Sequence, residues 1–466
     1  MALVLRNVWT VILAAALMPD SALHGSESVH VPGSGPPRVI ATTPELGDAG
    51  VDPSLSELRI VFDRDMSPRG HSLCGGGPMF PSTGKLRWES PRVAVVPVRL
   101  APDHEYSLSI NCPAATNFRS ADGEPAEPFP MRFRTHGGAP GTEPSPFAVP
   151  PTSEQQRESV AALRRAIEER YSYRDLRGVE WAARFAAHAE ALEQAASRGA
   201  FAMEAARLLA AARDIHISIR VGIATIPTHR TAAAPNVRLD ALRSLVPGWR
   251  ERGPAVRSGL FDGEGRPAIG YIALLTCPGE PASLEPAFDA LREMNDCPAL
   301  IIDLRANGGG AELPVRDFAG CFLEAPAVYS LNDYRDPDAP SGFGRRFERT
   351  VEPSADQHRL KTYGGKVAVL IGPAVCSSAE SLVLMLDANP RATLVGARTC
   401  GSSGNPRPVE LPNGVVVLLP SWRDYFPDGT LLEGRGIEPE VPVKAEPGSF
   451  KDSDPVLDAA LRLLRE

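Results

Sequence analysis

The spacing of hydrophobic residues changes twice along this chain of 466 residues, and each change predicts a different kind of structure. Between residues 37 and 136, short apolar runs alternate with turns rich in Pro, Gly and Asp, which is typical of an antiparallel β-sandwich. The strands expected there are 38–41, 58–62, 93–97, 106–110 and 131–135. Residues 137–152 are rich in Pro and Gly and predict a linker after this first domain.

From residue 153 the apolar period becomes helical. Two sets of positions recur every three or four residues, namely Val160, Leu163, Ile167 and Tyr171, then Trp181, Phe185, His188 and Leu192. This spacing places the side chains of each set on one face of a helix. We therefore predict a small bundle of three helices at residues 153–215.

The remaining residues, 216–466, show the alternation of an α/β core. Continuous apolar runs predict buried strands at 269–275, 300–304, 367–371, 393–395 and 415–419. Helices are expected between them, at 284–295, 312–323 and 378–388. Residues 324–365 are polar and rich in Pro and Gly, and they predict a surface hairpin or a lid-like loop. The expected fold is therefore multidomain.

Net charge and one apolar run near the N-terminus reduce the number of possible functions and locations. The chain carries 49 Lys and Arg against 57 Asp and Glu, a net charge of −8, so no basic surplus is available for nucleic acid. An apolar run at residues 8–18 follows Arg6 and precedes small residues, which predicts a signal peptide at residues 1–25. A buried N-terminal helix is the alternative. No run reaches the roughly 18 apolar residues that a membrane span needs. We expect an exported protein, periplasmic or extracellular, without a transmembrane anchor.

Seven cysteines are spread along the chain without the CxxC spacing of a zinc site, so no metal is predicted. In an oxidising compartment some of them pair. Cys74 and Cys112 fall within the first domain and are the first pair expected. Cys376 and Cys400 flank turns at the ends of neighbouring strands, and they are candidates for a second disulfide. No cofactor motif accompanies them, and none is expected.

Two strand ends carry candidate chemistry. The strand at 300–304 runs into Gly308-Gly309-Gly310, where glycine permits positive φ and exposes backbone N–H groups. A tight turn without further function is the alternative. The strand at 367–371 is followed by Ser377 and Ser378 at the start of a helix, where the helix field favours developing negative charge. A simple helix cap is the alternative there.

Four segments in this order resemble the carboxyl-terminal processing, or tail-specific, serine proteases. They are the glycine turn at 303–310, a Ser-Ala-x-Glu element that begins at Ser377, the strand and loop at 394–401, and a late Gly-x-Gly element at 434–440. The resemblance covers about residues 155 to 445. It implies a ClpP/crotonase-like core, Ser377 as nucleophile, and the N–H groups of Gly309 and Ser378 as the oxyanion hole. Phrases in the first domain resemble bacterial Ig-like domains.

One difference from the Ser-Lys members indicates which branch of the family this chain resembles. Ser-Lys members place their lysine where this chain has Ser402, and no lysine occurs between Lys366 and Lys444. The branch that includes the tricorn core protease and the repeats of the interphotoreceptor retinoid-binding protein uses a histidine at the end of the helical bundle, with a late glutamate. Residues 213–216 resemble its Asp-Gly-His-Thr motif and supply His216, although isoleucine replaces the usual glycine.

A serine nucleophile needs a base that is neutral near pH 7, and a carboxylate that orients this base. Among nine histidines, His216 alone ends a helical segment before a strand. Together with this position, the resemblance implies that His216 is the base and that Glu433, just ahead of Gly434, orients it. Asp214 and Glu380 are alternative carboxylates, with a local cap or salt bridge as the simpler role of Glu380.

These features together predict an exported serine endopeptidase that hydrolyses a protein or peptide substrate through an acyl-enzyme. The alternative is a catalytically inactive protein on the same fold that binds a peptide or a hydrophobic ligand. Only about 50 residues separate His216 from Gly270, too few for the PDZ domain that Ser-Lys members carry. The sequence does not indicate the natural substrate or the oligomeric state.

Overall fold

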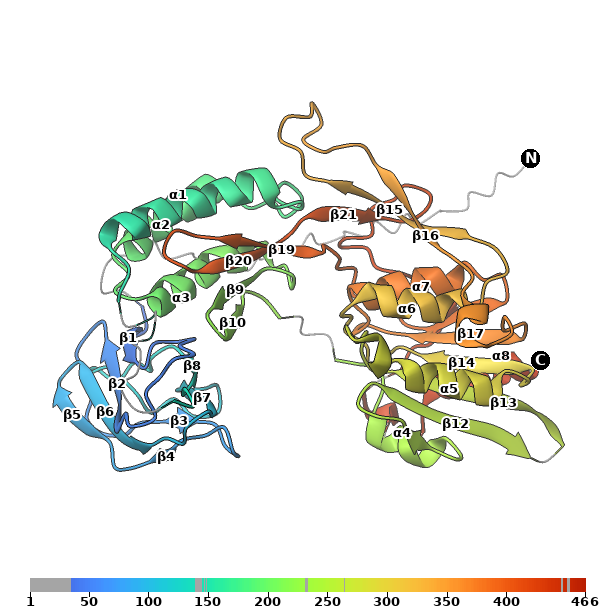
Figure 1. The fold of residues 1–466 in the computed structure, drawn as a ribbon, viewed down its shortest axis with the longest axis horizontal. Helices are drawn as coiled ribbons and strands as arrows, with labels where there is room; N and C mark the ends of the chain where they lie inside the picture. Colours follow the sequence, from blue (N-terminus) through green and yellow to red (C-terminus); the bar gives the residue numbers. More distant parts are fainter. Residues whose placement is uncertain are drawn as a thin grey trace, which may run out of the picture. The chain divides into compact units, whose positions relative to one another are not determined.

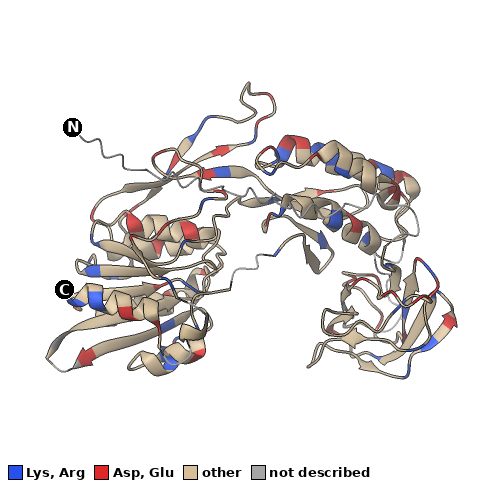
Figure 2. Ribbon diagram, turned by 180° about the vertical axis from the view of Figure 1, so that it is seen from behind, with Lys and Arg blue, Asp and Glu red and all other residues tan. Residues whose placement is uncertain are grey.

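The structure is a computed structural model that describes residues 35–138, 145, 147, 149–230, 234–263, 265–445, 447–450 and 453–466. The predicted signal peptide at residues 1–25 lies outside these ranges, as does much of the predicted linker. Among the described residues, no helix has the length and apolar character needed to cross a membrane. Lys and Arg are interspersed with Asp and Glu over helices and strands alike (Figure 2).

The first strands form two antiparallel sheets. One has the order β1-β2-β6-β4, with β5 paired to β6, and the other has the order β3-β7-β8. The bounds are β1 Val39–Thr43, β2 Glu57–Phe62, β3 Leu73–Cys74, β4 Ser82–Thr83, β5 Arg87–Ser90, β6 Val93–Arg99, β7 Glu105–Ile110 and β8 Phe129–Arg134. All five predicted strands are confirmed. The missed strands, β3 to β5, are too short for an alternating pattern. The likeness to Ig-like domains stays a prediction.

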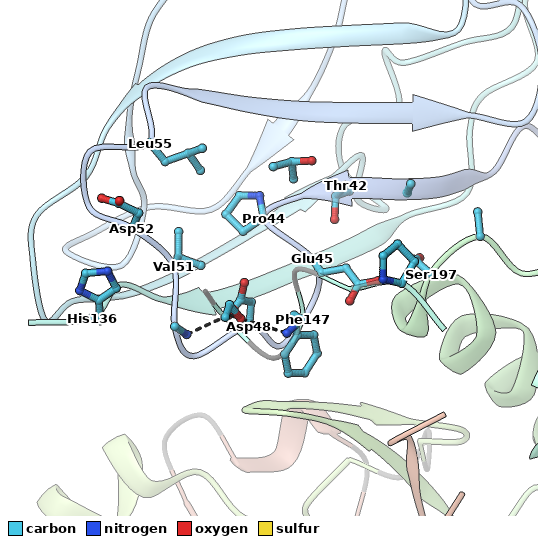
Figure 3. Close-up of a pocket in the computed structure, with 16 residues that line it drawn as sticks. Thr42, Pro44, Glu45, Asp48, Val51, Asp52, Leu55, His136, Phe147 and Ser197 are labelled. Atoms are coloured by element: carbon cyan, nitrogen blue, oxygen red, sulfur yellow. Dashed lines mark hydrogen bonds between the residues drawn. The ribbon is translucent and has the colours of Figure 1, made fainter. Parts of the chain in front are cut away.

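A disulfide links β3 to the residues after β7. Cys74 and Cys112 have Cα atoms 6.2 Å apart, which confirms the first predicted pair. Beside this sandwich, where the turn after β1 meets the start of α3, lies a pocket of about 620 Å³ with Glu45, Asp48 and Ser197 in its lining (Figure 3). None of the predicted site residues lines this pocket.

Three helices follow, as predicted: α1 Ser153–Arg170, α2 Trp181–Glu193 and α3 Arg198–Leu209. The side chain of Thr152 accepts a hydrogen bond from the N–H of Gln155 at the start of α1, and Ser197 caps α3 in the same way. A short 3₁₀ turn, Ala210–Ala212, follows α3. It ends at Arg213, which has a φ of +49°, and the chain then turns toward Asp214 and His216.

A four-stranded antiparallel sheet packs against these helices, in the order β10-β9-β20-β19. Its strands are β9 Ser218–Val221, β10 Ala224–Pro227, β19 Pro406–Glu410 and β20 Val416–Pro420. The assignment of residues 415–419 to the α/β core was therefore wrong. Val417 and Leu419 are buried in the same cluster as the bundle. The apolar run predicts a strand correctly, but it contains no information about which sheet the strand joins.

The α/β core is a seven-stranded sheet in the order β11-β12-β13-β14-β17-β18-β22. Its strands are β11 Arg250–Glu251, β12 Val256–Gly263, β13 Arg266–Leu274, β14 Ala299–Asp303, β17 Lys366–Ile371, β18 Ala392–Gly396 and β22 Val441–Pro442. Strands β13, β14, β17, β18 and β22 are parallel to their neighbours. Ile272, Ile302, Val369 and Leu394 lie side by side across the first four of them. The predicted strands β13, β14, β17 and β18 are confirmed.

Helices cover both faces of this sheet (Figure 1). On one face lie the predicted helices, α5 Glu285–Met294, α6 Glu312–Gly320 and α7 Ser378–Asp387. On the other face lie α4 Leu239–Leu245 and α8 Pro455–Arg465, which the sequence analysis missed. The signal for α8 was present, because Asp454 caps it and Pro455 opens it.

A separate three-stranded sheet contains β15 Ala327–Tyr334, β16 Phe347–Val351 and β21 Trp422–Tyr425. Strands β15 and β16 are the hairpin predicted within residues 324–365. At the end of β14, the fully buried guanidinium of Arg305 bonds to Asp303 at 2.7 Å and to Asp454 at 2.8 Å. Because one buried guanidinium bridges two buried carboxylates, it fastens the start of the glycine turn to α8.

Candidate active site

Ser377 lies at the junction between β17 and α7, one residue before the helix begins. Its φ of +59° and ψ of −132° are uncommon for a residue with a side chain. A sharp strand-to-helix turn of this kind exposes the hydroxyl above the sheet and places it in the positive field of the helix. Ser377 and Ser378 both line a cleft.

The glycine turn after β14 packs directly against this junction. A Cβ atom on Gly309, whose φ is +101°, would lie 2.7 Å from the carbonyl oxygen of Cys376 and 2.9 Å from Cβ of Ser377. Only glycine permits this approach. The N–H of Gly309 donates to Oδ1 of Asn307 at 2.9 Å, within its own turn. The N–H of Ser378, at the first position of α7, has no intrahelical acceptor. The two predicted oxyanion donors therefore lie side by side, and that of Ser378 is the less engaged.

Glu380 is 1% exposed and joins α7 to the loop at residues 399–403. Its carboxylate accepts hydrogen bonds from Oγ1 of Thr399 at 2.5 Å and from the N–H groups of Gly401 at 2.8 Å, Ser402 at 2.9 Å and Ser377 at 3.3 Å. Burial raises the pKa of Glu380 to about 7. The contact with Ser377 is the predicted local cap, but three of the four donors come from the distant loop.

A disulfide fastens the same loop a second time. Cys376 and Cys400 are bonded, with Cα atoms 5.2 Å apart, which confirms the second predicted pair. The N–H of Ser377 also donates to the carbonyl oxygen of Ser402 at 2.9 Å. The residue that stands at the lysine position of the Ser-Lys branch is thus in direct contact with the backbone of Ser377.

His216 reaches this loop from the end of the helical bundle. Its imidazole is 9% exposed, and Nδ1 lies 3.2 Å from Oγ of Ser402 and 3.8 Å from Oδ1 of Asp214. Burial lowers the pKa of His216, the charge of Asp214 opposes this shift, and that of Arg177 adds to it. The described side chains of His216 and Ser377 share no direct hydrogen bond, so Ser402 is the link between them.

The predicted orienting carboxylate, Glu433, contacts the next residue of the loop, Ser403. It is buried, and it accepts a hydrogen bond from the N–H of Ser403 at 2.7 Å and another from the guanidinium of Arg177. Burial raises the pKa of Glu433. Arg177 also lies 3.7 Å from Asp214. Asp214, the alternative named from the sequence, is therefore the carboxylate nearer to the imidazole.

Sequence reasoning missed two members of this group. Arg177 lies in an irregular segment after α1, where no motif or period marks it. Ser402 was recognised as the residue at the lysine position, but not as a partner of His216. Both contacts join segments more than 180 residues apart in the chain, and no local pattern reports such a contact.

Ser377 opens into a cleft of about 970 Å³. The first turns of α6 and α7 form one side, and residues 403–407 with the β15-β16-β21 sheet form the other. Charged and aromatic side chains line it, namely Glu312, Arg316, Asp317, Tyr334, Arg349, Arg407 and Trp422. A cleft of this size accommodates several residues of an extended chain.

Residues 268–443 match the model of peptidase family S41. The chain is 29% identical over 195 residues to carboxyl-terminal-processing peptidase 2, chloroplastic, of Arabidopsis thaliana, which covers 41% of the chain and 35% of that protein. It is 25% identical over 158 residues to a carboxy-terminal-processing protease of Bartonella bacilliformis, covering 34% of each. A crystal structure of a candidate peptidase from Parabacteroides merdae matches 67% of the chain and 97% of its own, with a TM-score of 0.57 and 21% identity.

Residues 268–443 are therefore similar to a family S41 peptidase domain, as the four sequence motifs predicted. The matched residues include Gly309, Ser377, Ser402 and Glu433, whereas His216 lies outside them. The chain spans about a third of the length of the curated relatives that it matches. The solved structure supports the fold alone.

Replacing Glu380 tests whether it holds the loop. Glu380→Ala leaves the three donors of the loop without an acceptor, whereas the N–H of Ser377 keeps the carbonyl oxygen of Ser402. The free energy of unfolding should therefore fall by about 3 kcal/mol or more. Urea unfolding followed by circular dichroism measures this change. Asp387→Ala, at an exposed position on the same helix, is the matched control and should shift stability by about 0.5 kcal/mol or less. Equal stability of the two variants would contradict the assignment.

Proposed function

We propose that this protein is an exported serine endopeptidase that hydrolyses peptide bonds through an acyl-enzyme. The observation that carries the proposal is the position of Ser377, at a turn with positive φ, at the start of α7 and in the wall of the cleft. The glycine turn packs against it, and His216 approaches its loop. These positions support a site that combines a nucleophile, a base and backbone donors, which is what acyl transfer requires.

Acylation begins when Oγ of Ser377 attacks the substrate carbonyl carbon and its proton passes to His216. The N–H of Ser378 stabilises the resulting oxyanion, and the N–H of Gly309 joins it once its bond to Asn307 is exchanged for one to the substrate. The proton then moves from His216 to the leaving amine, and the C–N bond breaks. Water attacks the ester by the same route and releases Ser377.

His216 is the proposed base because no lysine occupies the loop. A proton on Nδ1, directed at Ser402 and Asp214, leaves Nε2 free to accept the proton of Ser377. Without substrate, the distance between base and nucleophile at such sites is often longer than in the reactive complex, and substrate binding shortens it. Glu433 keeps a positioning role, since it holds Ser403 and Arg177 rather than the imidazole itself.

The proposed substrate is a protein or peptide, which the names of the curated relatives support. The proposed export rests on the signal-like residues 1–25 and on two disulfides, which form and persist in oxidising compartments. A binding protein without catalysis is the second candidate. It is favoured by one observation, the hydrogen bond that His216 makes to Ser402 in place of Ser377.

A serine-reactive phosphonate separates these two candidates. Wild type should be labelled, and Ser377→Ala should lose labelling while its thermal unfolding stays nearly unchanged, because Ser377 provides the reacting oxygen. Ser381→Ala, which also lines the cleft, is the control and should label normally. Mass spectrometry of the intact protein measures the result. Equal labelling of wild type and Ser377→Ala would move the role to another residue, and no labelling of either would favour the binding protein.

The pH dependence of labelling tests the base. Since burial lowers the pKa of His216 and only the neutral imidazole accepts a proton, the rate should rise through one acid limb centred below about pH 6.5 and then hold. His216→Ala should lose about 10³-fold or more in rate, and Glu433→Gln should lose less. A limb centred well above neutral pH, as a lysine base gives, would contradict the assignment.

A further inference from the structure

The cleft beside Ser377 contains more positive charge than its own carboxylates neutralise. Arg349 on β16 forms an ion pair with Glu312 at the start of α6. Glu312 also accepts a hydrogen bond from the hydroxyl of Tyr329 at 2.5 Å. Arg349 and Glu312 therefore neutralise each other's charge, and the remaining charged groups in the cleft wall are Arg316, Asp317 and Arg407.

Arg407 is the cation best placed to meet a substrate. It is exposed on the edge strand β19, between Pro406 and Pro408, whose rings restrict the backbone on both sides. Among the described residues, no carboxylate lies within ion-pair distance of Arg407. The carboxylate nearest to it in sequence on β19, Glu410, is three residues away and points to the opposite face of the strand.

An aromatic surface holds the Arg407 side chain in place. The guanidinium carbon lies 5.5 Å from the centre of the Tyr334 ring, which is stacked on Phe347 at 5.7 Å and lies 6.0 Å from Trp422. A ring supports a guanidinium without consuming its N–H donors. Those donors match the planar, bidentate geometry of a carboxylate.

We propose that Arg407 forms a subsite for an acidic side chain, Asp or Glu, of a peptide bound across the cleft. This inference rests on the proposed function, because it concerns the substrate of the same site. Arg316 on α6 adds to the positive potential from across the cleft, but its neighbour Asp317 offsets that contribution. Arg407 is therefore the residue that sets the preference.

The test uses peptides that differ at one position. Synthetic peptides with amidated C-termini that wild type cleaves are remade with Glu, Gln or Lys at each position around the cleaved bond, and kcat/KM is measured. At one position Glu should exceed Gln by about tenfold, the order of a charge-assisted contact in a partly desolvated cleft, and Lys should fall below Gln. Arg407→Gln should abolish this discrimination and Arg407→Glu should reverse it.

The control is Arg462→Gln on α8, which changes net charge equally but lies outside the cleft lining. It should keep the wild-type preference. Binding of such Glu, Gln and Lys series to Ser377→Ala is also measured by fluorescence anisotropy. If wild type cleaves no peptide, the series is built on an amidated peptide that Ser377→Ala binds, so the subsite is still tested. Failure of cleavage or of phosphonate labelling would contradict the proposed function only, because the subsite is judged by the preference among peptides. A Glu-to-Gln ratio that Arg407→Gln leaves unchanged, or a preference that appears only with free C-terminal carboxylates, would overturn the subsite.

Discussion

The carboxylate of Glu380 is the constraint on which the geometry of the site depends. It accepts hydrogen bonds from Ser377 on one side and from the loop at residues 399–402 on the other. Buried donors of this kind are costly to leave unpaired, so this carboxylate fastens the loop to the start of the helix. Because Ser402 belongs to that loop and contacts His216, the same carboxylate fixes how the proposed nucleophile and the proposed base are placed.

The proposed base comes from outside the matched residues 268–443. His216 follows the helical bundle, and the pairing of β9 with β20 brings that segment beside the returning chain. Asp214, Arg177 and Glu433 then form a buried cluster in which one guanidinium lies between two carboxylates. Breaking such a cluster by removing one partner is costly. His216 is buried beside this cluster, and burial lowers the pKa of its imidazole. The neutral form, which a base requires, is therefore favoured.

Much of this arrangement was predictable from local patterns. The buried parallel strands follow from continuous apolar runs, and the glycine turn and Ser377 follow from the residues that each turn needs. The residues that the sequence did not assign act across long separations: Arg177 with Glu433, Ser402 with His216, and β20 with β9 rather than with the core. Their side chains have no period or motif of their own, because their role is determined only when distant segments pack together. Glu433 shows the same limit, since the sequence named it as the partner of His216, whereas its hydrogen bonds go to Ser403 and Arg177.

The most direct test of the central claim is a crystal structure of the protein after reaction with a serine-directed phosphonate. We predict phosphorus bonded to Oγ of Ser377 and an imidazole nitrogen of His216 within about 3.2 Å of that oxygen. The N–H of Ser378 should point at the phosphonyl oxygen. Phosphorus on Ser402 or Ser378, or a lysine nitrogen nearer to the adduct than His216, would contradict the account.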